Sequence, residues 1–113
     1  MRVEKLIKKQ DVNNFLSEIK QTFPNFVAGI LCDNHGFPIA SKVPKNFHIK
    51  ENQLALSAIA KNRDFIQDKN FMKVKRSIDK YKKVKLFLLL EKTHKYVSRF
   101  KALKELIENQ SIF

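Results

Sequence analysis

Few residues in this chain are of types that perform chemistry, and their spacing does not favour it. The three histidines, His35, His48 and His94, lie far apart, and Cys32 is the only cysteine. Metal sites usually draw their ligands from closely spaced residues, so we expect no metal site. Cys32 lies in an apolar run, whereas a nucleophilic cysteine needs a nearby base and partial exposure. We therefore expect Cys32 to be a small core residue.

Other catalytic patterns are also missing from the sequence. The two glycines, Gly29 and Gly36, never precede a Lys-Ser or Lys-Thr pair, so no phosphate-binding loop of that type is present. Ser41 and Ser57 lie in no nucleophile motif. Asp33 and His35 flank a predicted turn, where local hydrogen bonding explains them. The sequence predicts a protein that is not an enzyme, with no catalytic residue, no cofactor and no metal.

Positive charge is the most pronounced chemical feature. The 113 residues include 23 Lys and Arg against 11 Asp and Glu, a net charge of +12. Residues 69–104 contain thirteen basic residues against two acidic ones, Asp79 and Glu91. Such a field attracts nucleic acid, anionic lipid or an acidic protein surface, although a lysine-rich solvated surface has the same composition. The predicted face for an anionic partner comprises Lys73, Lys75, Lys80, Lys82, Lys83 and Lys85.

Length and composition indicate a single domain over residues 1–113, in which residues 1–9 extend the first helix or fray. Hydrophobic residues make up 43% of the chain and include ten Phe, which is enough for a core. No apolar stretch approaches the roughly 20 residues that span a bilayer. The N-terminus lacks the apolar centre of a secretion signal. With one cysteine and no internal disulfide, we expect a cytoplasmic location.

The first half of the chain predicts a helix, two strands and a second helix. Asp11 is the candidate N-cap of the first helix, which ends near Phe23 because Pro24 disfavours helical geometry before it. The continuous apolar run 26–32 is typical of a strand covered on both faces. A turn that closes at Gly36 leads into the returning strand 37–41, in which Pro38 suits an edge or a strand start. The second predicted helix covers residues 49–66.

The second half predicts two strands and a final helix. Residues 70–79 alternate apolar and charged side chains, which indicates a half-exposed strand, and residues 80–92 form a stronger one. Thr93 is the predicted cap of a helix over residues 94–109. The buried stripe predicted for this helix is Val97, Phe100, Leu103 and Ile107. The order of elements indicates an α+β fold.

The second predicted helix is apolar around most of its circumference. Its segment 54–60 reads LALSAIA. A helix on one sheet needs only an apolar stripe, so such a helix needs a second cover. That cover could come from the same chain, but so short a chain has few elements to supply it. A subunit interface is therefore favoured.

Two motifs, HGFPIAS at 35–41 and LALSAIA at 54–60, resemble signatures of the roadblock (dynein light-chain) family. The resemblance covers about residues 14–66, and beyond them it depends on the order of elements. It implies an αββαββ(β)α fold, an antiparallel sheet with helices on its faces. Two strands fit between Gln67 and Thr93, and a third would be very short.

The resemblance also implies a dimer, in which the second helices pair and the third strands join edge to edge. The dimer contacts that we predict on this basis are Leu54, Ala55, Ala58, Ile59, Met72, Val74 and Arg76. Family members act mainly as scaffolds and regulators of small Ras-like GTPases, or as adaptors. We therefore expect a non-enzymatic dimeric scaffold that docks a small Ras-like GTPase, as a homodimer or with a related chain. The alternative is a protein whose Lys-rich face, 69–104, binds nucleic acid or an anionic membrane.

Overall fold

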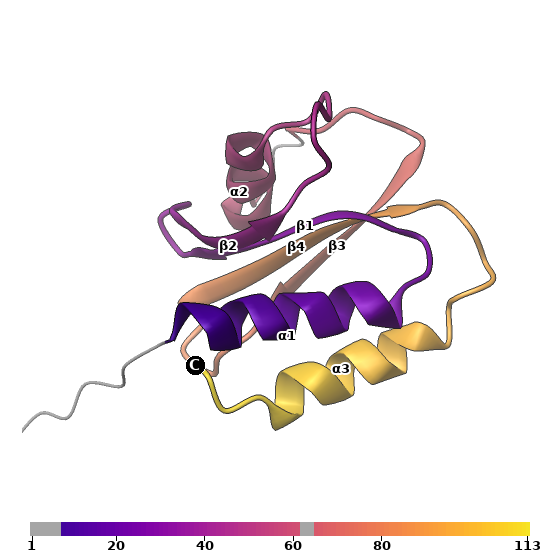
Figure 1. Ribbon diagram of the computed structural model, residues 1–113. Helices are drawn as coiled ribbons and strands as arrows, with labels where there is room; N and C mark the ends of the chain where they lie inside the picture. The colour runs from indigo at the N-terminus through magenta and orange to yellow at the C-terminus, as the bar shows by residue number, and fades with distance from the viewer. Residues whose placement is uncertain (1–7, 62–64) are drawn as a thin grey trace, which may run out of the picture.

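The computed structural model describes residues 8–61 and 65–113, and these form three helices and one four-stranded sheet (Figure 1). The elements follow in the order α1 (Lys9–Thr22), β1 (Phe26–Asp33), β2 (Pro38–Lys42), α2 (Glu51–Ile59), β3 (Phe71–Ser77), β4 (Val84–Glu91) and α3 (Arg99–Asn109). The strand order is β2-β1-β4-β3, and every pair is antiparallel. The predicted α+β class is confirmed. The described residues between Gln67 and Thr93 form two strands, and the prediction for residues 1–7 lies outside the described residues.

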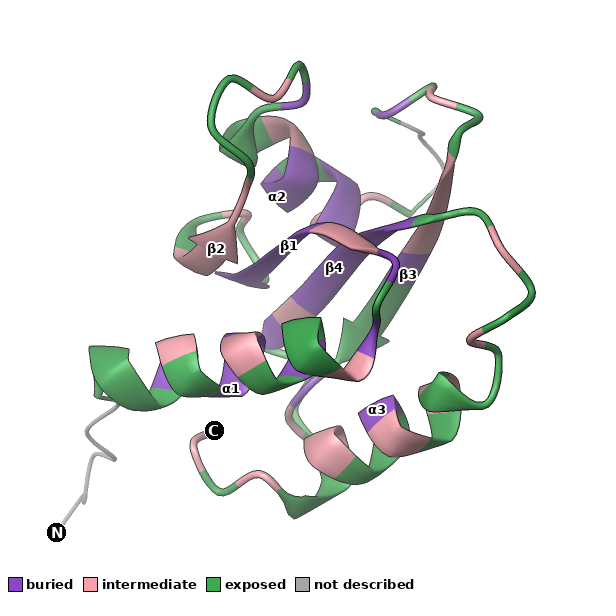
Figure 2. Cartoon of the chain, turned by 45° about the vertical axis from the view of Figure 1, so that its right-hand side comes forward, coloured by how far each residue is buried: buried purple, intermediate pink, exposed green. Residues whose placement is uncertain are grey.

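Helices cover both faces of the sheet. Helices α1 and α3 lie on one face and α2 lies on the other, so that β1 and β4 are buried between them (Figures 1 and 2). Leu31 and Leu88 belong to the core on the α1 and α3 side, whereas Ile30 and Phe87 belong to the core under α2. The apolar run of β1 is therefore covered on both faces, as its composition predicts.

The first helix begins earlier than its predicted cap. Lys8 is the N-cap residue, and Asp11 lies in the first turn of α1, so the prediction of Asp11 as the cap is wrong. An acidic side chain in a first turn still interacts favourably with the positive end of the helix dipole. The C-cap residue Phe23 is extended, as expected before Pro24.

The hairpin of β1 and β2 matches its prediction closely. The Asp33 Oδ1 atom accepts hydrogen bonds from the backbone N–H groups of His35 at 2.8 Å and Phe37 at 3.0 Å. Gly36 has a φ of +88°, a conformation that costs glycine little. Pro38 is the first residue of β2, which is an edge strand and so does not need that N–H.

Helices α2 and α3 are shorter than predicted. Helix α2 ends at Ile59 because Ala60 is extended, and residues 62–64 of the predicted helix lie outside the described residues. Helix α3 begins at Arg99, whereas Thr93 accepts a hydrogen bond from the backbone of Lys95 in a preceding turn. Val97 therefore precedes the helix and is 58% exposed, so its predicted place in the buried stripe is wrong.

Candidate interaction surfaces

Cys32 lies in the core beneath α2. Its side chain is fully buried, and its Sγ atom lies 3.9 Å from the backbone oxygen of Ala55. Burial, followed by the nearby charge of Asp33, raises the pKa of the Cys32 thiol to about 11. The thiol is therefore protonated near neutral pH and is a poor nucleophile. The prediction that Cys32 is a core residue is confirmed.

The structure brings His48 together with Asp68, a pairing that the sequence spacing did not indicate. The His48 Nε2 atom lies 3.1 Å from the Asp68 Oδ2 atom, and the His48 ring packs against Phe47 and Phe71. The backbone N–H of Asn70, and then His48, lower the pKa of the Asp68 carboxyl. The pair links the residues that precede α2 to those that precede β3. Within residues 8–61 and 65–113, no three His, Cys, Asp or Glu side chains are grouped to hold a metal ion.

Three of the predicted dimer contacts lie on the side of α2 that faces the sheet. Leu54, Ala55 and Ala58 are at most 6% exposed and pack with residues of β1 and β4 in the same chain. These side chains offer no surface to a second copy, so the argument that α2 needs a second cover for them is wrong. The sheet of the same chain already supplies that cover, because β1 and β4 form an apolar floor under the helix.

The outer side of α2 is less apolar than its sequence indicates, but it is not fully polar. Leu56 is 42% exposed, and Ile59 is half-buried. Ile59 lies against the β1–β2 turn, where its Cδ1 atom is 3.1 Å from the position that a Cβ at Gly36 would take. Leu56 and Ile59 are thus the apolar residues of α2 that a partner protein can reach.

Strand β3 is an edge of the sheet. In an antiparallel ladder, the backbone N–H and C=O groups of successive residues point alternately toward and away from the neighbouring strand. The Ile78 N–H donates to the Val84 oxygen and the Lys92 N–H donates to the Asn70 oxygen, so Ile78 and Asn70 face β4. By this alternation, the backbone groups of Phe71, Lys75 and Ser77 point away from β4. A second strand could hydrogen-bond with this outer edge.

The predicted β3 contacts differ in burial. Val74 is buried and Met72 is half-buried, both on the α1 and α3 side of the sheet. Arg76 is exposed, and its Nη1 atom donates to the backbone oxygen of Lys75 at 2.7 Å. Of these three side chains, Arg76 presents the largest accessible surface to a partner.

The predicted basic face separates into two sets in the structure. In the first set, Lys73 donates to the backbone oxygen of Ile66, Lys75 donates to that of Ala60 at 2.5 Å, and Lys85 donates to the Ser77 hydroxyl at 3.0 Å. Ala60 is the C-cap residue of α2, so the Lys75 ammonium stabilises the negative end of that helix.

The second set, Lys80, Lys82 and Lys83, lies in the β3–β4 turn and is exposed. Among the described residues, no carboxylate forms an ion pair with these three side chains. The first set therefore has a role in holding the fold together, whereas the second set is available to an anionic partner.

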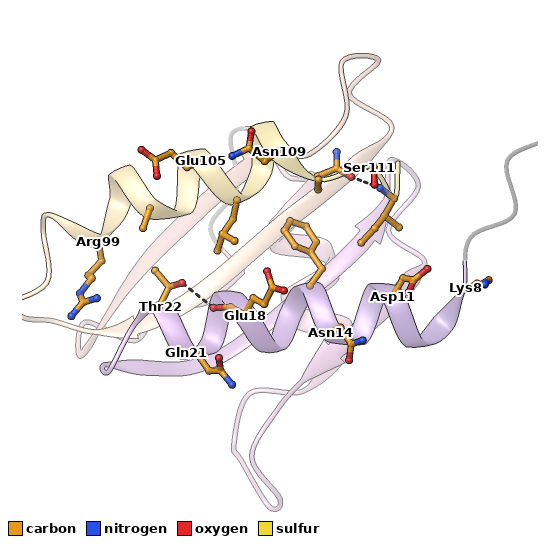
Figure 3. A pocket seen from close by; sticks show the side chains of 15 residues that line it. Lys8, Asp11, Asn14, Glu18, Gln21, Thr22, Arg99, Glu105, Asn109 and Ser111 are labelled. Carbon is orange, nitrogen blue, oxygen red and sulfur yellow. Dashed lines mark hydrogen bonds between the residues drawn. The ribbon is translucent and has the colours of Figure 1, made fainter.

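A groove of about 970 Å³ runs between α1 and α3, and the sequence did not indicate it (Figure 3). Its apolar lining comes mainly from Phe15, Leu106 and Ile112. Its charged lining residues are Lys8, Asp11, Glu18, Arg99 and Glu105. With three acidic and two basic side chains, the groove lacks the positive charge that dominates the rest of the protein. It is open and largely polar, unlike the apolar and enclosed pockets that bind small molecules.

No protein-family model, curated protein or solved structure matches this chain. The resemblance to the roadblock family therefore stays a prediction. In the part of the chain that the structure describes, no helix is both long and apolar enough to cross a lipid bilayer.

Proposed function

We propose that this protein is a non-enzymatic adaptor that binds another protein through the β3 edge and the outer side of α2. The observation that carries the proposal is the position of β3 at an edge of the sheet, where the backbone groups of Phe71 and Ser77 point away from β4. An exposed edge recognises an extended segment of a partner through backbone hydrogen bonds. The resemblance to the roadblock family identifies two candidate partners, a small Ras-like GTPase and a second roadblock-like chain.

The charge of β3 favours a partner of different sequence over an identical copy. If two β3 strands paired in antiparallel fashion around Val74, Lys73 of one copy would lie opposite Lys75 of the other. Like charges directly opposite each other destabilise a strand pair, typically by tenths of a kcal/mol to about 1 kcal/mol. A partner strand without basic side chains opposite Lys73 and Lys75 would avoid this repulsion. We therefore favour a heterotypic complex over the homodimer.

The test is binding to small Ras-like GTPases encoded near this gene, each loaded with GDP or with a GTP analogue. Sedimentation equilibrium of the protein alone measures any homodimer. We expect the Leu56→Glu variant to weaken partner binding by about tenfold or more, because Leu56 is exposed on the outer side of α2. Substitutions at Leu54, Ala55 or Ala58 are unsuitable, since a charge there would be buried within one chain.

Val97→Glu is the matched control, because Val97 is also an exposed apolar residue but precedes α3. This variant should bind the partner as the natural chain does. Two results would contradict the proposal. The first is a monomer that binds none of the GTPases and no related chain at micromolar concentration. The second is a Leu56→Glu variant with unchanged affinity for a partner that does bind.

A further inference from the structure

Two hairpin turns lie side by side at one end of the sheet (Figure 1). Asp33 of β1 pairs with Val84 of β4. The Asp33 N–H donates to the Phe37 oxygen, and the Ile78 N–H donates to the Val84 oxygen. These contacts align Phe37, Asp33, Val84 and Ile78 in one row across the four strands. With a strand spacing of about 4.8 Å, the two turns lie within about 15 Å of each other.

Each turn exposes one large aromatic side chain. Phe37 is 68% exposed in the β1–β2 turn, and Tyr81 is 70% exposed in the β3–β4 turn. One exposed apolar residue on a surface needs no explanation. Two exposed aromatic side chains on neighbouring turns, at the same end of the sheet, instead indicate a binding surface. We call this end, with Phe37 and residues 80–83, the aromatic-basic end.

Within residues 8–61 and 65–113, no acidic side chain forms an ion pair with the lysines of the aromatic-basic end. Lys80, Lys82 and Lys83 surround Tyr81, and the Lys80 Nζ atom lies 5.1 Å from the Tyr81 ring centroid. The acid of this turn, Asp79, accepts hydrogen bonds from the backbone N–H groups of Lys83 and Val84 at 2.8 and 3.0 Å. Its carboxylate therefore stabilises the turn and forms no ion pair with the three lysines, whose side chains are exposed.

We propose that the aromatic-basic end binds the surface of an anionic lipid bilayer. Lys80, Lys82 and Lys83 pair with anionic headgroups, while Phe37 and Tyr81 enter the headgroup region. Clustered lysines are attracted to anionic lipid by about 1 kcal/mol each. Tyrosine favours the membrane–water interface because its ring is apolar and its hydroxyl is polar. Two turns at one end of the molecule can reach a flat surface together, which side chains spread over a curved surface cannot.

The arrangement favours lipid over single-stranded nucleic acid. Proteins that bind single strands place aromatic rings along a basic groove, on which successive bases stack. Here the central strands carry helices on both faces, and the ammonium groups of Lys73 and Lys75 are bound to backbone oxygens of this chain. The exposed rings lie at the tips of two turns instead. This inference does not depend on the adaptor proposal, because it uses neither the β3 edge nor the outer side of α2.

The experiment is co-sedimentation of the full chain with lipid vesicles. One vesicle preparation contains phosphatidylcholine alone, and the other contains phosphatidylcholine mixed with phosphatidylserine. We expect binding to the mixed vesicles and little binding to the neutral ones. Replacing Lys80, Lys82 and Lys83 together by Gln should lower the partition coefficient roughly 100-fold. Replacing Phe37 and Tyr81 together by Ser should also weaken binding, and more so at high salt, where the electrostatic attraction is screened.

Matched controls remove the same groups from elsewhere. One control replaces Lys92, Lys95 and Lys101 together by Gln, which removes three exposed lysines outside the aromatic-basic end. The other control, Val97→Ser, removes an exposed apolar side chain. These variants should bind the mixed vesicles nearly as the natural chain does. Circular dichroism establishes that each variant is folded.

Three results would overturn the proposal. One is equal binding to neutral and mixed vesicles, or no binding to either. Another is an equal loss in the Lys92, Lys95 and Lys101 control, which would reveal attraction by net charge alone. The third is tight binding of a single-stranded RNA oligonucleotide through Lys80, Lys82 and Lys83 without vesicle binding, which would assign these lysines to nucleic acid.

Discussion

The two hairpin turns at the end of the sheet use the same local chemistry but different residues. In each turn an aspartate accepts two backbone hydrogen bonds, Asp33 from His35 and Phe37, and Asp79 from Lys83 and Val84. Each turn also contains one residue with positive φ. That residue is Gly36 in the β1–β2 turn, with φ of +88°, and Lys82 in the β3–β4 turn, with φ of +58°.

The two turns differ in the steric cost of the residue that has positive φ. Glycine adopts positive φ at little steric cost, whereas a residue with a Cβ loses about 1–2 kcal/mol there. The β1–β2 turn thus has the less strained residue, and the β3–β4 turn has a lysine where glycine would be favoured. Residues in strained conformations often mark functional positions. The comparison therefore agrees with a role for the charge of Lys82 at the aromatic-basic end.

The largest expected effect is that of Gly36→Ala. The new Cβ would be held at positive φ and would lie 3.1 Å from the Ile59 Cδ1 atom. We expect a loss of about 1–2 kcal/mol in the free energy of unfolding, measured by urea denaturation. His35→Ala is the control, because it changes the same turn without altering a positive φ, and it should stay within about 0.5 kcal/mol of the natural chain. Equal losses in both variants would show that the loss does not come from the positive φ of Gly36.

A smaller effect is expected when the charge of Asp33 is removed. The Phe37 N–H, and then the His35 N–H, lower the pKa of the Asp33 carboxyl. A group with a lowered pKa stabilises the folded state above its unfolded pKa of about 4, and this contribution is lost as the pH falls through the folded pKa. At neutral pH, Asp33→Asn should be less stable by at most about 1 kcal/mol, since the carboxyl is exposed to solvent.

Thermal unfolding of the natural chain and Asp33→Asn at neutral pH and at about pH 2 checks this dependence. The difference between the two proteins should shrink as the pH falls through the folded pKa of Asp33, because the carboxyl then loses its charge. A difference that is the same at both pH values would mean that Asp33 acts through its shape and not through its charge.

The smallest expected effect is a gain in stability for Lys82→Gly. Relief of positive φ gains about 1–2 kcal/mol, and the greater freedom of glycine in the unfolded chain offsets about 0.5–1 kcal/mol of it. The net gain should be about 0.5 kcal/mol in urea denaturation. Lys83→Gly is the control with the opposite expected sign, because Lys83 has an ordinary φ. If Lys82→Gly is instead less stable, the strain assigned to Lys82 is absent.

The parts of the fold that the sequence predicted correctly depend on neighbouring residues. The β1–β2 hairpin follows from Asp33, Gly36 and Pro38, whose conformations are restricted by their own chemistry. The end of α1 near Phe23 follows in the same way from Pro24. The start of α3 was missed because Thr93 caps a turn there, and a capping side chain fits a turn as well as a helix.

The candidate surfaces were predicted less well, because burial depends on residues distant in the sequence. Leu54 and Ala58 are buried by β1 and β4, and the sequence of α2 alone does not reveal the width of that apolar floor. In the sequence, Lys73 and Lys75 alternate with apolar residues, as ordinary surface lysines of a strand do. Their bonds to Ile66 and Ala60 depend on how the chain returns across the sheet.

The sequence by itself determined the α+β class, the first hairpin, the core position of Cys32 and the positive charge of the chain, since these depend on local conformational preference and on residue counts. Only the tertiary structure decided which side of α2 faces solvent, which lysines remain available and which turns lie together. The pairing of β1 with β4 brings the turns that contain Phe37 and Tyr81 to the same end of the sheet, although these residues are 44 positions apart in the sequence. Such a proximity arises from strand pairing between distant segments, which a periodic pattern within either segment does not encode.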